Sequence, residues 1–454
     1  WRDLDRDAFA AGLRAKYPRA AAAFPAPRRD RAAEEGLAQA LDRELNSCRV
    51  PRGAPRSGPG RAVLLVPWLK PGGADEINAA VVRQLAEDHG WEVTVVGTVV
   101  APGEELEDLL HGSRRADSCG GLRARFEPYT DDVLCFTGLM AWPAVLPFLR
   151  FLFETRDPDV ALISHSELAY RLLPWLRAYF PRVALMDLVH IAELRWRGGG
   201  YPFFSALHTR YLDHTISISA QLKDWMVERG HEPDKISVYY FVYELVDCRS
   251  PPPEENERAT SRAALGWGGP WEVAAVFVGR FVLQKRPELV LAVAKKLAED
   301  PDLRTRPWRL VMVGDGPKRE ALRRELGRSK GGGLARRLQL LGNVPHAQTL
   351  GLLRAADVFL LPSENEGISI AMAEAMSFGL AVVASDVGAQ AELLVPGTGR
   401  LVPYGGGKDD PPGYFSQAEV DAFAEELARL IRDPAAGRRE GAAARERVCG
   451  GGGG

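Results

Sequence analysis

The sequence predicts an α/β protein with two doubly wound parallel-sheet domains that face each other across a cleft, preceded by an N-terminal helical extension. Short apolar runs alternate with amphipathic segments after Arg61, and the same alternation starts again beyond Thr260. Continuous apolar runs are typical of parallel strands buried on both faces, with crossover helices between them. A chain of 454 residues with 46% hydrophobic content also has the length and the apolar side chains for two or three domains.

Changes in composition predict the domain boundaries. Residues 1–60 are rich in Ala, Arg and Glu and are expected to form the helical extension and a linker, with breaks at Pro25 and Pro27. The segment SPPPEENERAT at 250–260 has neither helical nor strand periodicity, which is typical of an interdomain linker. The sheet domains are therefore expected at 61–250 and 251–432. Residues 433–454 are expected to form a C-terminal helix and a Gly-rich tail.

Each domain has its own series of expected elements. In the first domain, strands are expected at 61–67, 91–97, 159–164, 182–189 and 214–219, with a helix at 75–89. In the second, strands are expected at 273–278, 309–313, 338–341, 358–361 and 381–384, with an amphipathic helix at 419–432. Ligands of such sheets gather at the carboxyl ends of the strands, so these ends are the places to search for a site.

One apolar stretch, Val133 to Phe153, is long enough to test as a membrane span. It contains Pro143, Pro147 and Arg150, and a charge at the centre of a bilayer costs at least ~2.5 kcal/mol. We therefore expect a buried helix and turn here.

Charge and cysteine content narrow the class of protein. The 58 Lys and Arg residues balance 60 Asp and Glu residues, so there is no overall basic field for nucleic acid, and we expect no nucleic-acid partner. The five cysteines are widely spaced and contain no CxxC pair, which predicts neither a zinc site nor a disulfide framework. We expect a cytoplasmic protein; peripheral membrane attachment and a targeting segment upstream of Trp1 stay open.

Glycines and cations follow several of the expected strands. Gly72 and Gly73 follow the first strand, and Gly279, Arg280 and Lys285 follow the first strand of the second domain. Glycines let a ligand approach the backbone closely, and two cations beside a helix start can neutralise a diphosphate.

The third strand end, VMVGDGPKRE, has Gly314 and Gly316 but places Arg319 where a dinucleotide fingerprint needs its third glycine. No P-loop pattern is present either. These features argue against nicotinamide, flavin or P-loop chemistry.

The segment PSENEGISIAMAEAMSFGL at 362–380 follows an apolar strand and predicts a helix over Ile368 to Phe378. Glu374 is a nearly lone carboxylate on this almost wholly apolar helix, so its burial requires a hydrogen-bonding partner such as a ribose diol. Glu366 lies just before the helix start, where free N–H groups can bind hydroxyls or phosphate; an ordinary acidic residue beside a helix dipole is the alternative.

These segments resemble the retaining glycosyltransferases of family 4, which have the GT-B fold of two Rossmann-like domains. The resemblance depends on GRFVLQK, VGDGP, LGNVP and EGISIAMAE in this order and covers roughly Arg61 to Arg432. It implies transfer of a hexose or pentose from a nucleoside-diphosphate sugar to a hydroxyl acceptor, with retention of anomeric configuration. The acceptor domain would be the first and the donor domain the second. No DxD motif follows a strand, so we expect no obligatory metal or other cofactor.

The resemblance assigns a role to each matching residue. Arg280 and Lys285 would bind the donor diphosphate, Glu366 a hydroxyl of the transferred sugar, and Glu374 the ribose. His190, in MDLVHI, resembles the histidine that approaches the donor sugar; a packed core histidine is the alternative. The remaining expected donor-binding residues are Gly73, Gly279, Gly314, Val344, Gly367, Ile368 and Ser369.

Three departures from this pattern keep alternatives open. The acceptor loop has GGADE in place of GGxE, so either Asp75 or Glu76 can be the acceptor residue. SENEGIS lacks the aromatic or proline residue often found after EG, which leaves the donor sugar undecided, and the acceptor can be a glycan, a lipid-linked sugar or a small molecule. A sugar-nucleotide epimerase or hydrolase, and an inactive GT-B module that binds a protein or membrane through residues 1–60, are the other candidate functions.

Overall fold

The computed structural model describes residues 58–67, 72–99, 123–136, 142–267, 272–328, 333–407 and 409–450. The predicted extension at 1–60 lies outside these ranges except for its last three residues. The chain forms two compact units, one ending at Tyr239 and one beginning at Tyr240, with residues 219–221 in the second. The division thus falls ahead of the linker that the composition predicts at 250–260.

The first unit is built on a seven-stranded sheet whose strands all run parallel. In spatial order these are β3 (Val133–Cys135), β2 (Glu92–Gly97), β1 (Arg61–Val66), β4 (Val160–Ser164), β5 (Ala184–Val189), β6 (His214–Ser217) and β7 (Ile236–Val238). The five strands expected in this domain are all present. The outermost strands β3 and β7, which have three residues each, were not expected because so short a run shows no periodicity.

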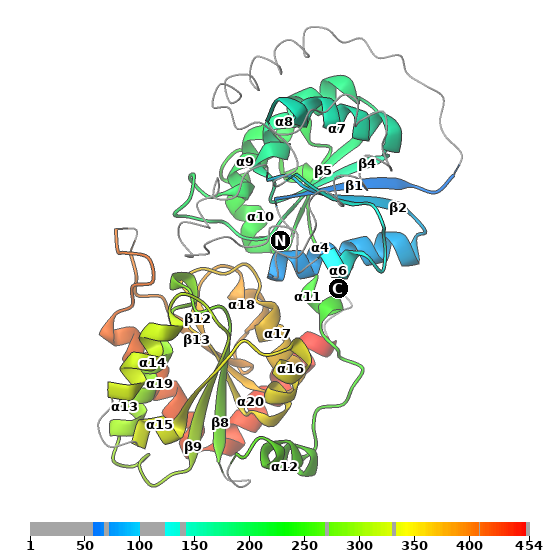
Figure 1. The fold of residues 1–454 in the computed structure, drawn as a ribbon. Coiled ribbons are helices and arrows are strands. Elements are labelled where there is room, and N and C mark those ends of the chain that lie inside the picture. The colour runs from blue at the N-terminus through cyan, green and yellow to red at the C-terminus, as the bar shows by residue number, and fades with distance from the viewer. Residues whose placement is uncertain are drawn as a thin grey trace. The chain divides into compact units, whose positions relative to one another are not determined.

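Helices cover both faces of this sheet (Figure 1). They are α4 (Gly73–Arg83) with a π-helical turn at Gln84–Asp88, α6 (Arg123–Phe126), α7 (Trp142–Arg156), α8 (Glu167–Tyr179), α9 (Tyr201–His208) and α10 (Ala220–Val227), with 3₁₀ turns at Thr209–Tyr211 and Pro233–Lys235. Side chains of α7 and α8 form one core with the strands, in which Trp175 and Tyr170 are almost fully buried. The expected helix at 75–89 is the pair α4 and its π-helical turn.

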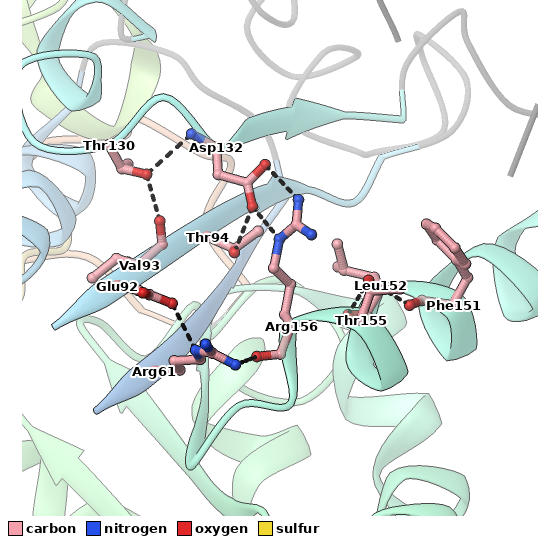
Figure 2. Close-up of polar contacts among 10 residues, drawn as sticks. All are labelled: Arg61, Glu92, Val93, Thr94, Thr130, Asp132, Phe151, Leu152, Thr155 and Arg156. Carbon is pink, nitrogen blue, oxygen red and sulfur yellow. Dashed lines mark hydrogen bonds and ion pairs between the residues drawn. The ribbon is translucent and has the colours of Figure 1, made fainter. Parts of the chain in front are cut away.

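A group of polar contacts ties together the amino ends of three strands in the first unit (Figure 2). Asp132, just before β3, accepts hydrogen bonds from Arg156 Nη2 at 3.0 Å and from Thr94 Oγ1 at 2.8 Å. Arg61, at the start of β1, pairs with Glu92 at the start of β2 at 2.6 Å. These contacts lie at the amino edge of the sheet, so they hold the strands in register without occupying the carboxyl edge.

The second unit repeats the plan with a six-stranded, all-parallel sheet. Its spatial order is β10 (Leu338–Gly342), β9 (Trp308–Val313), β8 (Val273–Val278), β11 (Val358–Leu361), β12 (Ala381–Asp386) and β13 (Gly399–Pro403). All five strands expected in this domain are present, and β13 is additional. In both sheets the first and fourth strands of the unit are neighbours, so the chain reverses its direction of winding between β1 and β4 and between β8 and β11.

Two layers of helix enclose the second sheet (Figure 1). The helices are α11 (Val242–Leu245), α12 (Glu255–Ala264), α13 (Pro287–Glu299), α14 (Arg319–Arg328), α15 (Gly333–Arg337), α16 (His346–Ala355), α17 (Ile370–Ser377), α18 (Gln390–Leu393), α19 (Gln417–Arg432) and α20 (Pro434–Gly450), with a 3₁₀ turn at Leu283–Lys285. The helices α13, α14, α15 and α19 share one core with the strands, and α17 and α20 pack together against β12.

The structure corrects two expectations. The supposed linker at 250–260 contains the start of α12, a helix stabilised by a capping box in which Glu254 and Glu257 each accept the backbone N–H of the other. The sequence feature that marks this helix is the pair of cap residues and not an apolar periodicity, because Arg262 is the only buried residue of α12. The spacing of the cysteines predicted no disulfide framework, but Cys248 and Cys449 form a disulfide bond across a sequence separation of 201 residues.

The apolar stretch at 133–153 is divided between strand β3 and helix α7. Among the helices that the structure describes, none is both long enough and apolar enough to cross a bilayer.

Candidate functional site

Loops from three neighbouring strands of the second unit meet at the carboxyl edge, next to the reversal between β8 and β11. The N–H of Gly279, after β8, donates to the carbonyl of Val313 at 3.0 Å, and the N–H of Gly314, after β9, donates to that of Gly342 at 2.8 Å. The next turn adds another backbone hydrogen bond between the same two loops, in which the Phe281 N–H donates to the Asp315 carbonyl at 2.8 Å. Backbone groups therefore connect the loops at this edge of the sheet.

Glycine is required for the two loops to approach this closely. A Cβ on Gly314, whose φ is +138°, would lie 1.9 Å from the carbonyl oxygen of Gly279. A Cβ on Gly316 would lie 2.6 Å from that of Phe281. The structure thus brings together Gly279 and Gly314, and it supplies the close backbone approach that the sequence pattern suggested.

Lys285 and Glu366 were expected to bind different parts of the donor, and in the structure they contact each other. The Lys285 ammonium, at the end of the 3₁₀ turn after β8, forms an ion pair with Glu366 Oε1. Ser363 Oγ donates to the same oxygen at 2.6 Å, and Glu366 is only 7% exposed. An ammonium has three donors, so Lys285 can keep this pair and still bind an anion.

Arg280 lies at the same strand end but has a different environment. Its side chain is exposed, and within the described part of the chain it forms no hydrogen bond or ion pair. Its five guanidinium donors are therefore available to a ligand.

A buried arginine that the sequence did not single out fixes the loop beneath Glu366. Arg286 has a φ of +46° and no exposed surface. Its Nη1 pairs with Glu419 Oε1 at 2.8 Å, and its Nε donates to the Pro362 carbonyl at 2.5 Å. Its Nη2 also donates to Ser385 Oγ at 2.9 Å. Nothing in QKRPE distinguishes this arginine from a surface cation, so only the fold reveals it.

Glu374 has the hydrogen-bonding partner that its burial requires. It lies on α17 with 8% exposure, and Oε1 contacts His346 Nε2 at 2.7 Å. Burial raises the pKa of the Glu374 carboxyl above its ordinary value, and the hydrogen bond from His346 offsets part of this rise. His346 is the first residue of α16 and follows Val344 by two positions. Val344, the predicted base-side residue, therefore lies two positions before the partner of the predicted ribose-binding residue Glu374.

The segment from Gly367 to Ser369 leads into α17, which begins two residues later than expected. Ser369 caps the helix through its Oγ, which accepts the Met372 N–H at 3.3 Å, and Ile368 is 6% exposed. The Gly367 carbonyl accepts the Ala389 N–H at 3.2 Å. A Cβ on Gly388, which precedes Ala389, would lie 1.8 Å from the Glu366 carbonyl. The chain after β12 thus supports the Glu366 loop.

The first unit contains the other two predicted residues. Gly73 is the first residue of α4 and is exposed. Of the two acidic residues that follow, Glu76 forms an ion pair with Arg125, and the side chain of Asp75 lies back toward Gly72, where a Cβ would be 3.4 Å from its Oδ2.

His190 follows β5 and is 4% exposed. Its Nε2 lies 3.0 Å from Ser164 Oγ, and its ring packs edge-on against His165 with 4.6 Å between centroids. Burial lowers the pKa of His190 well below 6.5, and the neighbouring His165 adds to this effect. The imidazole is therefore neutral at physiological pH. Its Nδ1 is buried and has no partner in the described part of the chain.

The predicted residues thus form two groups, each within one unit. Lys285, Glu366 and their supporting glycines share the carboxyl edge of the second sheet, while Gly73 and His190 belong to the first. Across the ranges that the structure describes, no group of three or more His, Cys, Asp or Glu side chains is arranged to hold a metal ion.

Comparison with known proteins connects this edge to an enzyme family. Residues 272–433 match the family model described as "Glycosyl transferases group 1". The lipopolysaccharide 1,6-galactosyltransferase of Salmonella typhimurium is 24% identical over 301 residues, which are 61% of this chain and 76% of that protein. The D-inositol 3-phosphate glycosyltransferase of Corynebacterium efficiens is 32% identical over 192 residues, 41% of this chain. The matched part spans only 43% of that relative.

Solved structures agree with the sheet topology. HepE of Anabaena, solved in complex with UDP and glucose, superposes with a TM-score of 0.61 at 18% identity, covering 85% of this chain and 94% of that protein. At this level of identity the likeness shows the fold.

Proposed function

Since this chain is a family 4-like glycosyltransferase of the GT-B fold, we propose that it transfers a glycosyl group from a nucleoside-diphosphate sugar to a hydroxyl acceptor with retention of anomeric configuration. The carboxyl edge of the second sheet is the proposed donor site. A UDP-sugar is the proposed donor, because HepE has been solved in complex with UDP and glucose. A glycan is the proposed acceptor, in line with the lipopolysaccharide galactosyltransferase among the relatives.

The observation that carries this proposal is the pairing of Lys285 with Glu366 at the strand reversal, beside the unpaired Arg280. Departure of the sugar leaves new negative charge on the diphosphate. Fixed cations accelerate the reaction if they stabilise that charge more strongly in the transition state than in the bound donor. We propose that Lys285 and Arg280 stabilise this charge, without an obligatory divalent cation.

The role of Glu366 follows from its partners. A carboxylate engaged by an ammonium and a hydroxyl is a weak nucleophile, so we assign it to a hydroxyl of the transferred sugar and not to a covalent intermediate. The acceptor hydroxyl would attack the anomeric carbon on the face from which the diphosphate leaves. The bond to the leaving oxygen breaks as the new bond forms, and that phosphate oxygen takes the acceptor proton.

The remaining residues would orient the donor. Glu374 would accept hydrogen bonds from the ribose diol while His346 holds one of its oxygens, with Val344 beside the base. The N–H groups of Gly367 to Ser369 would bind sugar hydroxyls or phosphate, because they precede a helix start. His190 would act toward the transferred sugar as a neutral hydrogen-bonding group.

Separate Lys285→Ala and Glu374→Ala variants test these assignments. We expect Lys285→Ala to lower kcat by about 10²–10³, the loss typical of removing one group that stabilises transition-state charge. We expect Glu374→Ala to weaken binding of UDP, measured by calorimetry. Lys296→Ala is the matched control, because Lys296 is exposed and forms a surface ion pair with Asp421 of the same unit.

Two results would contradict the proposal. Undiminished donor binding and turnover in both variants would remove the assigned roles. Turnover of the sugar nucleotide that proceeds equally fast without any acceptor would identify an epimerase or hydrolase.

A further inference from the structure

A pocket of about 570 Å³ lies at the edge of the second sheet opposite the donor site. Asp357, directly before β11, and Gly379, just before β12, mark the amino ends of two central strands. Helix α12, one face of α20 and the segment Pro252–Pro253 form its walls. The pocket shares no residue with Lys285, Glu366 or Glu374, so it is not part of the donor site.

The pocket has an excess of positive charge. Its lining includes Arg258, Arg262, Arg438 and Arg445 against Glu255, Asp357 and Glu446, a surplus of one positive charge. The Asp357 carboxylate is already satisfied, because it binds Arg262 Nη2 at 2.5 Å, Arg258 Nη1 at 3.1 Å and the Ala274 N–H at 2.8 Å. Its charge is therefore cancelled within the protein, and it does not repel an anion.

Two arginines keep donors for a ligand. Arg438 is exposed, and its side chain forms no hydrogen bond or ion pair with any residue that the structure describes. Arg258 uses only Nη1 for Asp357. Arg445 instead donates to the carbonyls of Ser377 and Ser250, neutral acceptors that leave its charge uncompensated.

The walls are fixed before any ligand arrives. The Cys248–Cys449 disulfide ties α20 to the chain ahead of α12, and the hydrogen bonds of Arg445 join the same two segments. Gly441 brings α20 against the end of α17, since a Cβ there would lie 1.9 Å from the Gly379 carbonyl. A site whose walls are tied in this way loses little conformational entropy when it binds.

We propose that this pocket is a second ligand site, which binds a small phosphorylated ring compound such as a sugar phosphate. Its volume lies within the roughly 300–1,000 Å³ of small-molecule sites. Guanidinium groups match the oxygens of a phosphate in a bidentate geometry. Phe378 and the two prolines give the pocket an apolar surface against which a ring can pack.

Calorimetric titration of the full chain with glucose 6-phosphate tests the site. We expect saturable one-to-one binding that Arg438→Glu weakens by about tenfold or more, because a charge-assisted contact is lost and a repulsion replaces it. Arg439→Glu is the matched control: Arg439 is the next residue of α20, it does not line the pocket, and it lies 3.7 Å from Asp433. Lys285→Ala should bind glucose 6-phosphate unchanged, which distinguishes this site from the donor site.

Several outcomes would overturn the proposal. These are absence of saturable binding, equal weakening by Arg439→Glu and Arg438→Glu, or loss of binding in Lys285→Ala. Equal affinity for inorganic phosphate would show that the ring does not contribute to binding. Equal affinity for glucose would show the same of the phosphate. None of these results depends on the transfer reaction, so the proposed function stands or fails separately.

Discussion

At the scale of single residues, the ion pair between Lys285 and Glu366 provides a partner for both charges at the proposed donor site. A buried carboxylate without a partner would be costly, and a lone ammonium would repel the other cations of the site. The pair satisfies both groups, and Ser363 adds a hydrogen bond to the same carboxylate oxygen. Binding of a diphosphate therefore need not bury an unpaired charge.

Replacing Glu366 with glutamine should separate binding from chemistry. Without its carboxylate partner the Lys285 ammonium is free for the diphosphate, so we expect UDP to bind as tightly as before or several-fold more tightly. The proposed contact with the sugar would be weakened, and we expect kcat to fall by at least about tenfold. Calorimetry with UDP and steady-state kinetics check the two parts.

The control for this variant is Glu288→Gln, which changes a surface partner of Lys318. Weaker UDP binding together with an unchanged kcat in Glu366→Gln would contradict the assigned role.

The two packed histidines of the first unit should make its stability depend on pH. Burial lowers the pKa of His165 to about 3, and that of His190 lies well below 6.5. Both bind protons more readily when unfolded, so their contribution to stability is complete above pH 6.5 and is lost as the pH falls toward 3. The slope is at most about 1.4 kcal/mol per pH unit for each histidine. Asp187, whose pKa is raised by burial to about 6, acts in the opposite sense.

His165→Asn isolates one of these contributions. Asparagine tolerates the φ of +55° at this position, so the backbone is preserved. Denaturant unfolding at pH 7 and pH 5 should show a smaller loss of stability on acidification in the variant than in the unchanged protein. The same difference should be absent for His89→Asn, since His89 is exposed. An equal pH dependence in all three proteins would show that His165 does not titrate differently on folding.

Sequence motifs suggest some residues of the proposed donor site, but they do not point to the residues that act through packing. Lys285 and Glu374 stand out because a cation after a strand and a carboxylate on an apolar helix are unusual in sequence. Arg286 and His346 do not, because their importance depends on Glu419 and Glu374, which are 133 and 28 residues away in the chain. A single sequence contains no signal for such pairs.

At the scale of elements, strands are easier to predict than the segments that support them. Buried parallel strands such as β8 and β11 appear at their predicted residues because apolar runs mark them. Helix α12 escaped prediction because its stability depends on a capping box and on the pairing of Arg262 with Asp357, and not on an apolar stripe. Local hydrogen bonding at a helix end is visible in sequence only when the cap residues are read before the periodicity.

The turn after β12 should be sensitive to a single methyl group. Gly388 has a φ of +55°, and a Cβ there would lie 1.8 Å from the Glu366 carbonyl, so Gly388→Ala must displace the Glu366 loop. We expect a loss of donor affinity and a destabilisation of about 1–3 kcal/mol beyond the backbone strain. Titration with UDP and denaturant unfolding measure the two effects.

Gly397→Ala supplies the control, because Gly397 also has a positive φ, of +91°, but a Cβ there meets nothing within 4 Å. It should show the strain of about 1–2 kcal/mol alone and keep full donor affinity. If both variants bind UDP equally well, the contact between Gly388 and the Glu366 loop does not position the donor site.

At the scale of the whole molecule, the repeated strand order follows from a sequence that alternates strands and helices twice. Right-handed crossovers leave few arrangements for such a series, and both sheets have the same reversal after their third strand. The fold class was therefore predictable from pattern alone. The disulfide was not, because Cys248 and Cys449 are brought together only when α20 has packed against the second sheet.

This disulfide should contribute to the stability of the second unit as a covalent constraint on its unfolded chain. It closes a loop of about 200 residues, for which the chain-entropy model gives a stabilisation of about 5 kcal/mol, at the upper end of the about 2–5 kcal/mol that loss of a native disulfide typically costs. Cys248→Ser, Cys449→Ser and the double variant should all lose the same free energy of unfolding, because any one substitution breaks the bond. Denaturant unfolding of the three variants, with non-reducing peptide mapping of the unchanged protein, measures this. Additive losses from the two single variants, or a map with free thiols at both positions, would show that the cysteines contribute through packing alone.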